Sequence, residues 1–302
     1  MRILAMNMNK VNYLKNLFKY ILSFVVLAFL LSSCEDPVPS DYIPETLIEA
    51  VLIVDEPIEN IIIMRTQPLN KAFDYNASLI DDAEVKIWTE EKEYNLIFRK
   101  EDKPGYFYPD TSEKVKSETT YFLEVTLKDG AKITGKTTTP KRSHWVYLPQ
   151  GDVYYPKDTL KLAPIDSLRI EFAPLEGKVF YILGIACIDS LGYGEYLTPA
   201  SDEKNRRIIR PWNEGNERFF SDLTTWTFLP TNKTPIVWTV FKWFGKHRAL
   251  VYFPDENYFN WFLQYVVKAS YDPLLSSVEG GIGVFGSASK ISHDFFLYKN
   301  QK

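Results

Sequence analysis

Apolar and polar residues alternate with period two along much of the chain after residue 46. The alternation is clear at residues 83–87 and 121–128, and the Asp129-Gly130 pair follows directly as a two-residue turn. Alternation bounded by turn residues is typical of half-buried strands, and Asp-Gly between two such runs indicates a hairpin. About seven short strands without a long helix predict an immunoglobulin- or fibronectin-like β-sandwich over residues 46–140.

The rest of the chain, residues 141–302, is also expected to be β-rich. Residues 168–172 alternate, and residues 179–188 are apolar on both faces, as in a central strand. One amphipathic helix is predicted at about 255–268, because apolar side chains recur there at helical spacing after Asp255, which suits an N-cap. The chain is therefore predicted to be mainly β, with a sandwich followed by a second β-rich domain that contains one late helix.

The N-terminus has the pattern of a lipoprotein signal peptide covering residues 1–33. Its first 19 residues carry basic side chains and no acid, and the apolar run at residues 20–31 is twelve residues long. A run this short matches a signal peptide, since a bilayer-spanning helix needs about 20 residues. The run ends in Leu-Ser-Ser-Cys, which resembles the bacterial lipobox. We therefore expect cleavage between Ser33 and Cys34 and acylation of Cys34, with palmitate among the acyl chains.

The mature chain is expected to be acidic. Removal of the first 33 residues takes four of the 35 basic residues and none of the 39 acids, which leaves a formal charge of −8. An acidic chain argues against nucleic acid and against an anionic membrane surface as partners. The lipid bilayer is instead expected to be reached through acylated Cys34, followed by a proline-rich, extended tether over residues 34–45.

A glycine-rich stretch near the C-terminus, residues 280–286, contains the G-x-G-x-x-G pattern of dinucleotide-binding loops. Such a loop needs a helix directly after it and a further strand ending in an acid about 20 residues on. Only 16 residues follow Gly286, so no βαβ unit fits and no nucleotide is expected. The stretch is predicted to be a strand or bulged turn. Its glycines would allow close backbone approach, against the helix that contains residues 259–266.

Residues able to form a catalytic or metal site are sparse. The three histidines lie far apart without zinc-ligand spacing, and no G-x-S-x-G nucleophile elbow occurs. The second cysteine, Cys187, is expected to be buried in an apolar strand, where a thiol is inert. No metal, cofactor or catalytic residue is therefore predicted, and the chain is not expected to be an enzyme. The alternative is a carboxylate-dependent enzyme that degrades glycans or peptides, with its site in the loops of residues 190–235.

Two sets of side chains are candidates for binding and modification. Aromatic side chains that reach solvent can stack on a sugar or a peptide, and the candidates in or near the predicted loops are Trp212, Phe219 and Trp226. Three triplets of the form Asp, hydroxyl residue, aliphatic resemble the O-glycosylation sequon of exported Bacteroidota proteins. The hydroxyl residues of these triplets are Thr159, Ser167 and Ser190.

Several features occur in an order that matches one family. They are the lipobox, the Glu35-Asp36 pair after it, the hairpin that ends at Pro140, the aromatic helix and residues 277–286. In this order and spacing the chain resembles the Bacteroidota lipoprotein family called domain of unknown function 4249. The resemblance implies an outer-membrane lipoprotein, often encoded beside a TonB-dependent receptor, with no established activity. Glu35-Asp36 is similar to signals for surface display, and the sequence leaves the cell surface and the periplasmic face as alternatives.

The favoured functional hypothesis is a non-catalytic binding or accessory module. It would be anchored to the outer membrane and act with a TonB-dependent transporter or an extracellular ligand. Its basis is a β-rich chain on an acyl tether, without a visible catalytic constellation.

Overall fold

The computed structural model divides the chain into two compact units, Met1–Ile43 and Pro44–Lys302. All the elements described below belong to the second unit. The structure describes residues 42–68, 70–101, 103–148, 151–155, 169–178, 180–189, 208, 224–267 and 275–299.

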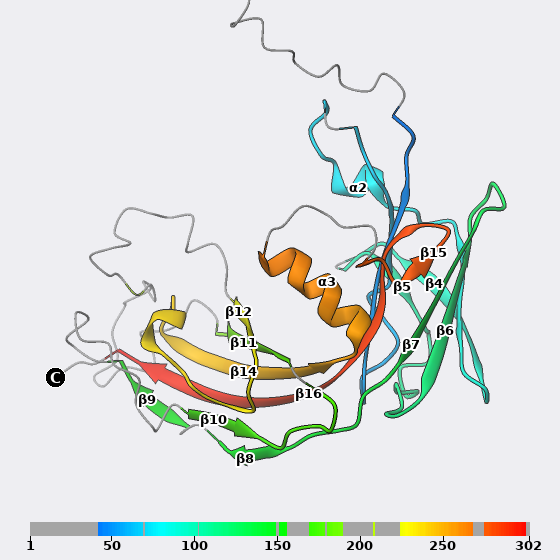
Figure 1. Cartoon of the computed structure of the whole chain (residues 1–302). Coiled ribbons are helices and arrows are strands. Elements are labelled where there is room, and N and C mark those ends of the chain that lie inside the picture. The colour runs from blue at the N-terminus through cyan, green and yellow to red at the C-terminus, as the bar shows by residue number, and fades with distance from the viewer. Residues whose placement is uncertain are drawn as a thin grey trace, which may run out of the picture. The chain divides into compact units, whose positions relative to one another are not determined.

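The described part is built mainly of strands (Figure 1). The strands are β1 (Thr46–Ile53), β2 (Ile62–Arg65), β3 (Glu84–Trp88), β4 (Glu93–Arg99), β5 (Gly105–Phe107), β6 (Thr120–Thr126), β7 (Lys132–Thr138), β8 (Trp145–Tyr147), β9 (Asp152–Tyr154), β10 (Arg169–Phe172), β11 (Tyr181–Cys187), β12 (Thr224–Leu229), β13 (Lys233–Pro235), β14 (Gly245–Pro254), β15 (Val278–Glu279) and β16 (Ile282–Tyr298). The helices are α2 (Tyr75–Ser78), α3 (Glu256–Val267) and the 3₁₀ helix η4 (Trp238–Val240).

The described strands form three sheets. A seven-stranded sheet has the order β12-β11-β14-β16-β1-β2, with β9 paired to β16. A six-stranded sheet has the order β15-β7-β6-β3-β4-β5, and a three-stranded sheet the order β13-β10-β8. The predicted hairpin at Asp129-Gly130 joins β6 to β7, whose pairing runs from Thr126↔Lys132 to Thr120↔Thr138.

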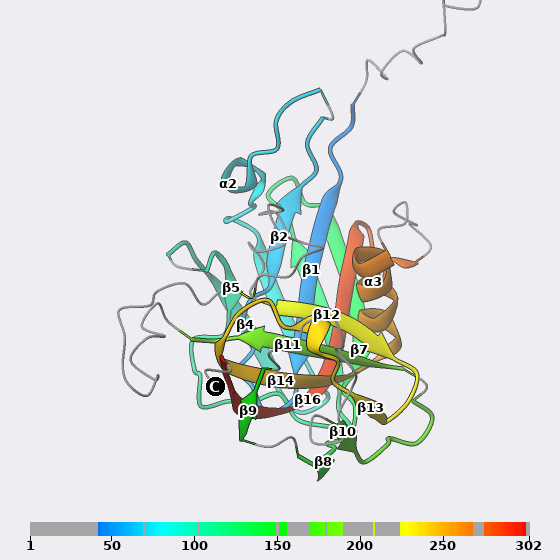
Figure 2. The same cartoon turned by 90° about the vertical axis from the view of Figure 1, so that its left-hand side faces the viewer.

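Strand β16 connects the two halves of the seven-stranded sheet. Its residues 282–288 pair in parallel with β1, and its residues 288–297 pair antiparallel with β14. Figure 2 shows β11 and β14 running across the view while β1 and β2 run nearly upright. Segments before and after residue 140 therefore share one sheet, and the domain boundary expected there stays a prediction.

The N-terminal strands enclose one core. Alternate residues of β1, such as Ile48 and Leu52, are buried against Val85, Leu123 and Val125 of the six-stranded sheet. Two facing sheets with a shared apolar interior are the arrangement of a β-sandwich. The prediction of a mainly β chain that begins with a sandwich is thus confirmed.

A second core lies against β11 and β14. Phe172 of β10 contacts Phe253 of β14 edge to face, with ring centroids 5.2 Å apart. Alternation along β14 places Val251 and Phe253 in this core and turns Leu250 and Tyr252 to the opposite side. We call this opposite side, which points away from the core, the outer face of the seven-stranded sheet.

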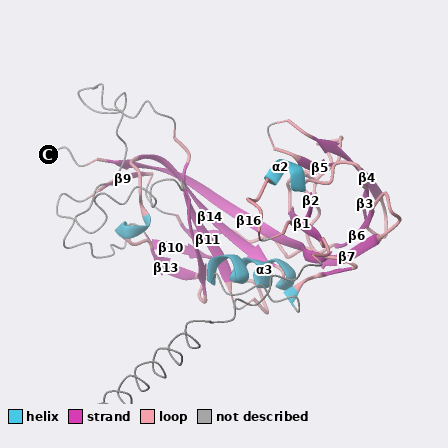
Figure 3. Ribbon diagram, turned by 90° about the horizontal axis from the view of Figure 1, so that it is seen from above, coloured by secondary structure: helices cyan, strands magenta, loops and turns pink. Residues whose placement is uncertain are grey.

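The predicted late helix is confirmed as α3, and it packs on the outer face beside β16 (Figure 3). Asp255 directly precedes it, and the Asp255 carboxylate accepts a hydrogen bond of 2.9 Å from the backbone N–H of Tyr258. That contact satisfies one of the free donors of the first turn, as the cap prediction requires.

The glycine run forms a bend and the start of β16 rather than a cofactor loop. Gly283 has φ +119°, and a Cβ there would collide with the carbonyl oxygen of Ile48 on the parallel strand β1. A Cβ at Gly286 would lie 2.8 Å from the backbone nitrogen of Tyr258 in α3. The prediction that these glycines permit close backbone approach, including approach to the helix, is confirmed.

Candidate functional site

Most residues singled out from the sequence lie outside the described part of the chain. This holds for the lipidation and cleavage residues, for two of the three aromatic candidates and for all three hydroxyl candidates. They are Ser33, Cys34, Thr159, Ser167, Ser190, Trp212 and Phe219. The loops predicted to hold the alternative carboxylate site, residues 190–235, are described only at residue 208 and from residue 224 onward. Trp226 is therefore the predicted binding residue that the structure places.

Trp226 lies flat against the outer face of the sheet. It belongs to β12 and stands opposite Gly184 of β11 in the antiparallel register. A Cβ at Gly184 would collide with the six-membered ring of the indole, so the glycine makes room for the ring to rest on the backbone. Trp226 remains 37 % exposed. One side of the indole thus has a rigid support while part of its surface stays open to a ligand.

Other aromatic side chains continue this surface. The Tyr252 ring lies 5.9 Å from the Trp226 ring, and the Phe180 ring lies 6.0 Å from the Phe228 ring. Phe180 also stacks on Phe259 of α3, with centroids 5.0 Å apart and planes within 5°. We call Trp226, Tyr252, Phe228, Phe180 and Phe259 the aromatic patch. Because four of its five side chains belong to strands and to α3, the patch is held mainly on regular elements.

A charged pair borders the patch at Tyr252. The Lys290 ammonium lies 5.9 Å from the centre of the Tyr252 ring and forms an ion pair with Glu56. Burial raises the pKa of the Tyr252 phenol, and the nearby Glu56 carboxylate raises it further. The phenol therefore stays protonated at neutral pH as a donor, and it makes no hydrogen bond with any residue the structure describes. The patch thus combines stacking surface with a polar edge.

The patch shows which signals the sequence interpretation missed. Gly184 interrupts the apolar strand β11, and a glycine inside a strand often marks close approach of another group. Tyr252 occupies an outer-face position of β14, which the alternation of residues 245–254 indicates. Both signals become informative only when the partner strand is known, because Gly184 and Trp226 are separated by 42 positions in the chain.

Residues with catalytic or metal-binding chemistry lie elsewhere. His247 is buried, where its ring stacks on Phe295 and its Nδ1 lies 2.9 Å from the Gly245 carbonyl oxygen. Cys187 is buried in β11, as predicted, with its sulfur 3.9 Å from the Phe244 carbonyl oxygen. Among the described residues, no three His, Cys, Asp or Glu side chains form a group that could hold a metal ion. Every helix in the described part of the chain is too short or too polar to cross a bilayer.

Comparison with known proteins places the chain in a family. No curated protein matches it. Among solved structures it is similar to a segment of two fibronectin type III domains from chicken tenascin. That match has 9 % sequence identity, a TM-score of 0.21, and coverage of 84 % of this chain and 98 % of the tenascin segment. A family model matches residues 36–293, and the chain belongs to that family, described as Domain of unknown function (DUF4249).

Proposed function

We propose that this chain is an outer-membrane lipoprotein that acts as a non-catalytic binding module, and that the aromatic patch contacts its ligand. The observation that supports this function is the Trp226 indole, which rests on Gly184 and stays partly exposed beside Tyr252. Exposed large aromatics that adjoin one another on a sheet are unusual on a solvated surface and are typical of interaction sites.

The shape and chemistry of the patch favour a carbohydrate. A sugar ring has a flat C–H face that stacks on an indole, and hydroxyl groups at its rim that hydrogen-bond with polar side chains. The Tyr252 phenol and the Lys290–Glu56 pair lie at the edge of the patch and offer such partners. Because the aromatic rings are already held by the sheet and α3, little side-chain entropy is lost when a ligand stacks on them.

The anchor of the proposed module is read from the sequence. The lipobox at residues 31–34, the short apolar run before it and the proline-rich stretch after it describe an acylated chain on a tether. A binding module held this way would collect ligand at the membrane for a neighbouring transporter, and a TonB-dependent receptor is the proposed partner.

Oligosaccharide binding tests the function directly. The acylated chain, purified in mild detergent, is applied to an oligosaccharide array, and hits are measured by calorimetry. We expect saturable binding, weakened at least about tenfold by Trp226→Ala, since a buried aromatic contact contributes roughly 2 kcal/mol or more. Trp88→Ala is the matched control, because Trp88 is a half-buried strand residue stacked on Phe122 in the other sheet. Absence of binding, or equal loss in both variants, overturns the proposal.

Co-purification tests the partner. A tagged chain extracted from native membranes under mild detergent is expected to bring down a TonB-dependent barrel in near-stoichiometric amount. Recovery of the lipoprotein alone, from membranes that contain such barrels, counts against the partner but leaves the ligand proposal to be decided by the array.

A further inference from the structure

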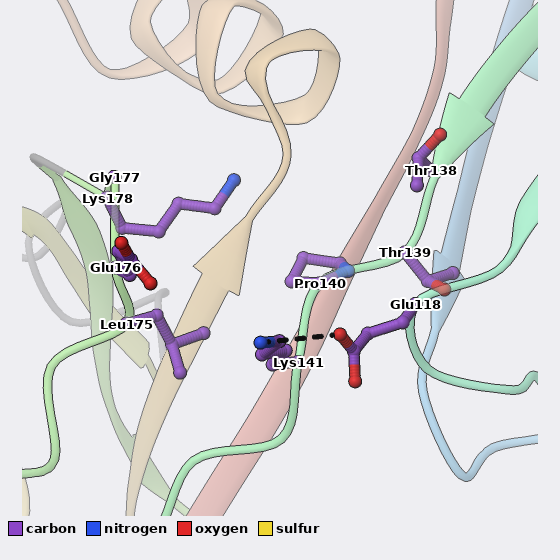
Figure 4. A pocket seen from close by; sticks show the side chains of 9 residues that line it. All are labelled: Glu118, Thr138, Thr139, Pro140, Lys141, Leu175, Glu176, Gly177 and Lys178. Atoms are coloured by element: carbon purple, nitrogen blue, oxygen red, sulfur yellow. Dashed lines mark ion pairs between the residues drawn. The ribbon is translucent and has the colours of Figure 1, made fainter.

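A groove lies between the linker after β7 and the turn before β11 (Figure 4). Its volume is about 390 Å³, within the range of small-molecule sites. Glu118 and residues 138–141 line one side of it, and residues 175–178 line the other. None of these belongs to the aromatic patch, so the groove is a separate feature of the molecule.

The two walls of the groove differ in how their charges are satisfied. On one wall, Lys141 and Glu118 form an ion pair of 3.5 Å. On the other, Lys178 and Glu176 form no ion pair with any residue the structure describes. Figure 4 shows Leu175 and Lys178 extending from their wall toward the side that bears Pro140 and Lys141. The groove thus has one ammonium and one carboxylate without an ion-pair partner among the described residues, beside two apolar side chains.

The surroundings of Lys178 restrict the class of ligand. Burial lowers the pKa of the Lys178 ammonium, while the charges of Asp255 and Glu256 act in the opposite direction. A half-buried ammonium gains from a carboxylate that pairs with it closely. A simple anion at this point would, however, also meet the negative charges of Asp255 and Glu256. A ligand that carries both signs avoids this repulsion, because its cationic end can pair with Glu176.

We propose that the groove binds an α-amino acid or the ends of a short peptide. The ligand carboxylate pairs with Lys178, its ammonium pairs with Glu176, and its side chain packs between Leu175 and Pro140. The nearby threonine hydroxyls are already engaged, since Thr138 bonds to Thr120 and Thr139 donates to the carbonyl of Lys116. The charges of Lys178 and Glu176, which pair with no described residue, therefore provide the recognition.

Ligand variants and protein variants together give a sharp test. The probe is the dipeptide glycyl-leucine, with its N-acetylated form and its C-amidated form, titrated into the acylated chain in detergent by calorimetry. Lys178→Met and Glu176→Gln keep side-chain size and remove one charge each. Loss of one charge-assisted contact is expected to weaken binding about tenfold or more. Lys178→Met should bind the free and amidated dipeptides alike, and Glu176→Gln should bind the free and acetylated dipeptides alike.

The control variant is Lys128→Met, because Lys128 is an exposed lysine far from the groove whose amine pairs with Asp82. It should bind all three probes as the parent protein does, and all variants should keep the parent melting temperature. Three results overturn the proposal. The first is the absence of saturable glycyl-leucine binding. The second is equal binding of the free and acetylated dipeptides by the parent protein, which indicates a plain anion site. The third is that the affinity lost through a ligand change and the affinity lost through a protein substitution simply add when the two are combined. None of these results bears on the aromatic patch.

Discussion

Thr137 donates a hydrogen bond of 2.6 Å from Oγ1 to Oδ2 of Asp255, and so ties the six-stranded sheet to the start of α3. The other carboxylate oxygen of Asp255 accepts from the backbone N–H of Ser287 at 3.0 Å and from that of Tyr258 at 2.9 Å. One buried side chain therefore joins β7, β16 and α3. Because Asp255 bonds to β16, which has side chains in both cores, its loss is expected to affect both.

Replacement of Asp255 is expected to destabilise the fold in a graded way. Asp255→Ala removes the helix cap and leaves buried donors unpaired, at a cost of about 1–3 kcal/mol in the free energy of unfolding. Asp255→Asn keeps an oxygen that accepts from the two backbone donors, and its amide N–H can donate to Oγ1 of Thr137. Its loss of unfolding free energy should therefore be smaller. Asp74→Ala is the control, since Asp74 caps the exposed four-residue helix α2 with one bond of 3.1 Å. Urea denaturation measures all three, and equal losses for both alanine variants would contradict the assignment.

The pH dependence of folding stability tests whether the pKa of the buried Asp255 carboxyl is raised. Burial raises the pKa of its carboxyl and outweighs the hydrogen bonds from Ser287 and Thr137. A raised folded-state pKa means that this group's contribution to stability is full below the unfolded value, about 3.9, and falls as pH rises through the folded value. Asp255→Asn cannot ionise, so its stability relative to the parent should improve as pH rises from about 4 toward 7. An unchanged difference across this range would be inconsistent with the raised pKa.

The glycines of β16 are expected to be structural. Gly283→Ala combines a left-handed backbone with a collision against the Ile48 carbonyl oxygen, whereas Gly130→Ala has φ +85° with open space around it. The backbone cost alone is about 1–2 kcal/mol. Gly283→Ala should cost at least about 2 kcal/mol more, since the clash must be relieved by moving β1 from β16. Thermal and urea unfolding of both variants gives the difference, and similar values would refute the close packing.

How far the sequence predicted this architecture depends on how far apart along the chain the interacting residues lie. The β6–β7 hairpin and α3 have local signals, Asp129-Gly130 and the Asp255 cap, and both were predicted close to their observed bounds. The parallel pairing of β1 with β16 joins residues more than 230 positions apart, and neither strand carries a local mark of its partner. The aromatic patch follows the same rule. Trp226 stands out by composition, but its support on Gly184 depends on strand register.

Gly184→Ala tests whether the position of Trp226 matters for binding. The new methyl group would occupy the space of the indole, so Trp226 must leave the sheet surface. We expect a loss of oligosaccharide affinity close to that of Trp226→Ala, with a changed near-UV circular dichroism spectrum. Gly151→Ala is the control, because nothing lies within 4 Å of its Cβ position. Full affinity in Gly184→Ala would show that ligand binding does not require the Trp226 indole to pack on the backbone at Gly184.

Acid should reduce the folding stability that Asp294 contributes on the outer face of the seven-stranded sheet. Arg248 donates to both Asp294 oxygens, at 2.6 and 3.0 Å, and these bonds lower the pKa of the carboxyl to about 2. A lowered folded-state pKa gives stability that is present above about 4 and is lost as pH falls toward 2. Because the pair is partly exposed, its contribution should be only about 1 kcal/mol after solvent screening. Asp294→Asn should therefore show a shallower loss of stability over this pH range, measured by urea denaturation, and an unchanged acid slope would contradict the lowered pKa.

The two cysteines provide a matched test of the anchor. Acylation of Cys34 should hold the chain in the membrane fraction, because each buried CH₂ of an acyl chain contributes about 0.8 kcal/mol and several chains act together. Cys34→Ala should block lipid attachment and move the chain to the soluble fraction or leave its signal peptide uncleaved. Cys187→Ala changes a buried thiol of β11 instead, so that variant should stay in the membrane fraction with at most a modest loss of stability. Mass spectrometry of the N-terminal peptide should show acylated Cys34 as the first residue, whereas an unmodified Cys34 in membrane-bound protein would rule out this anchor.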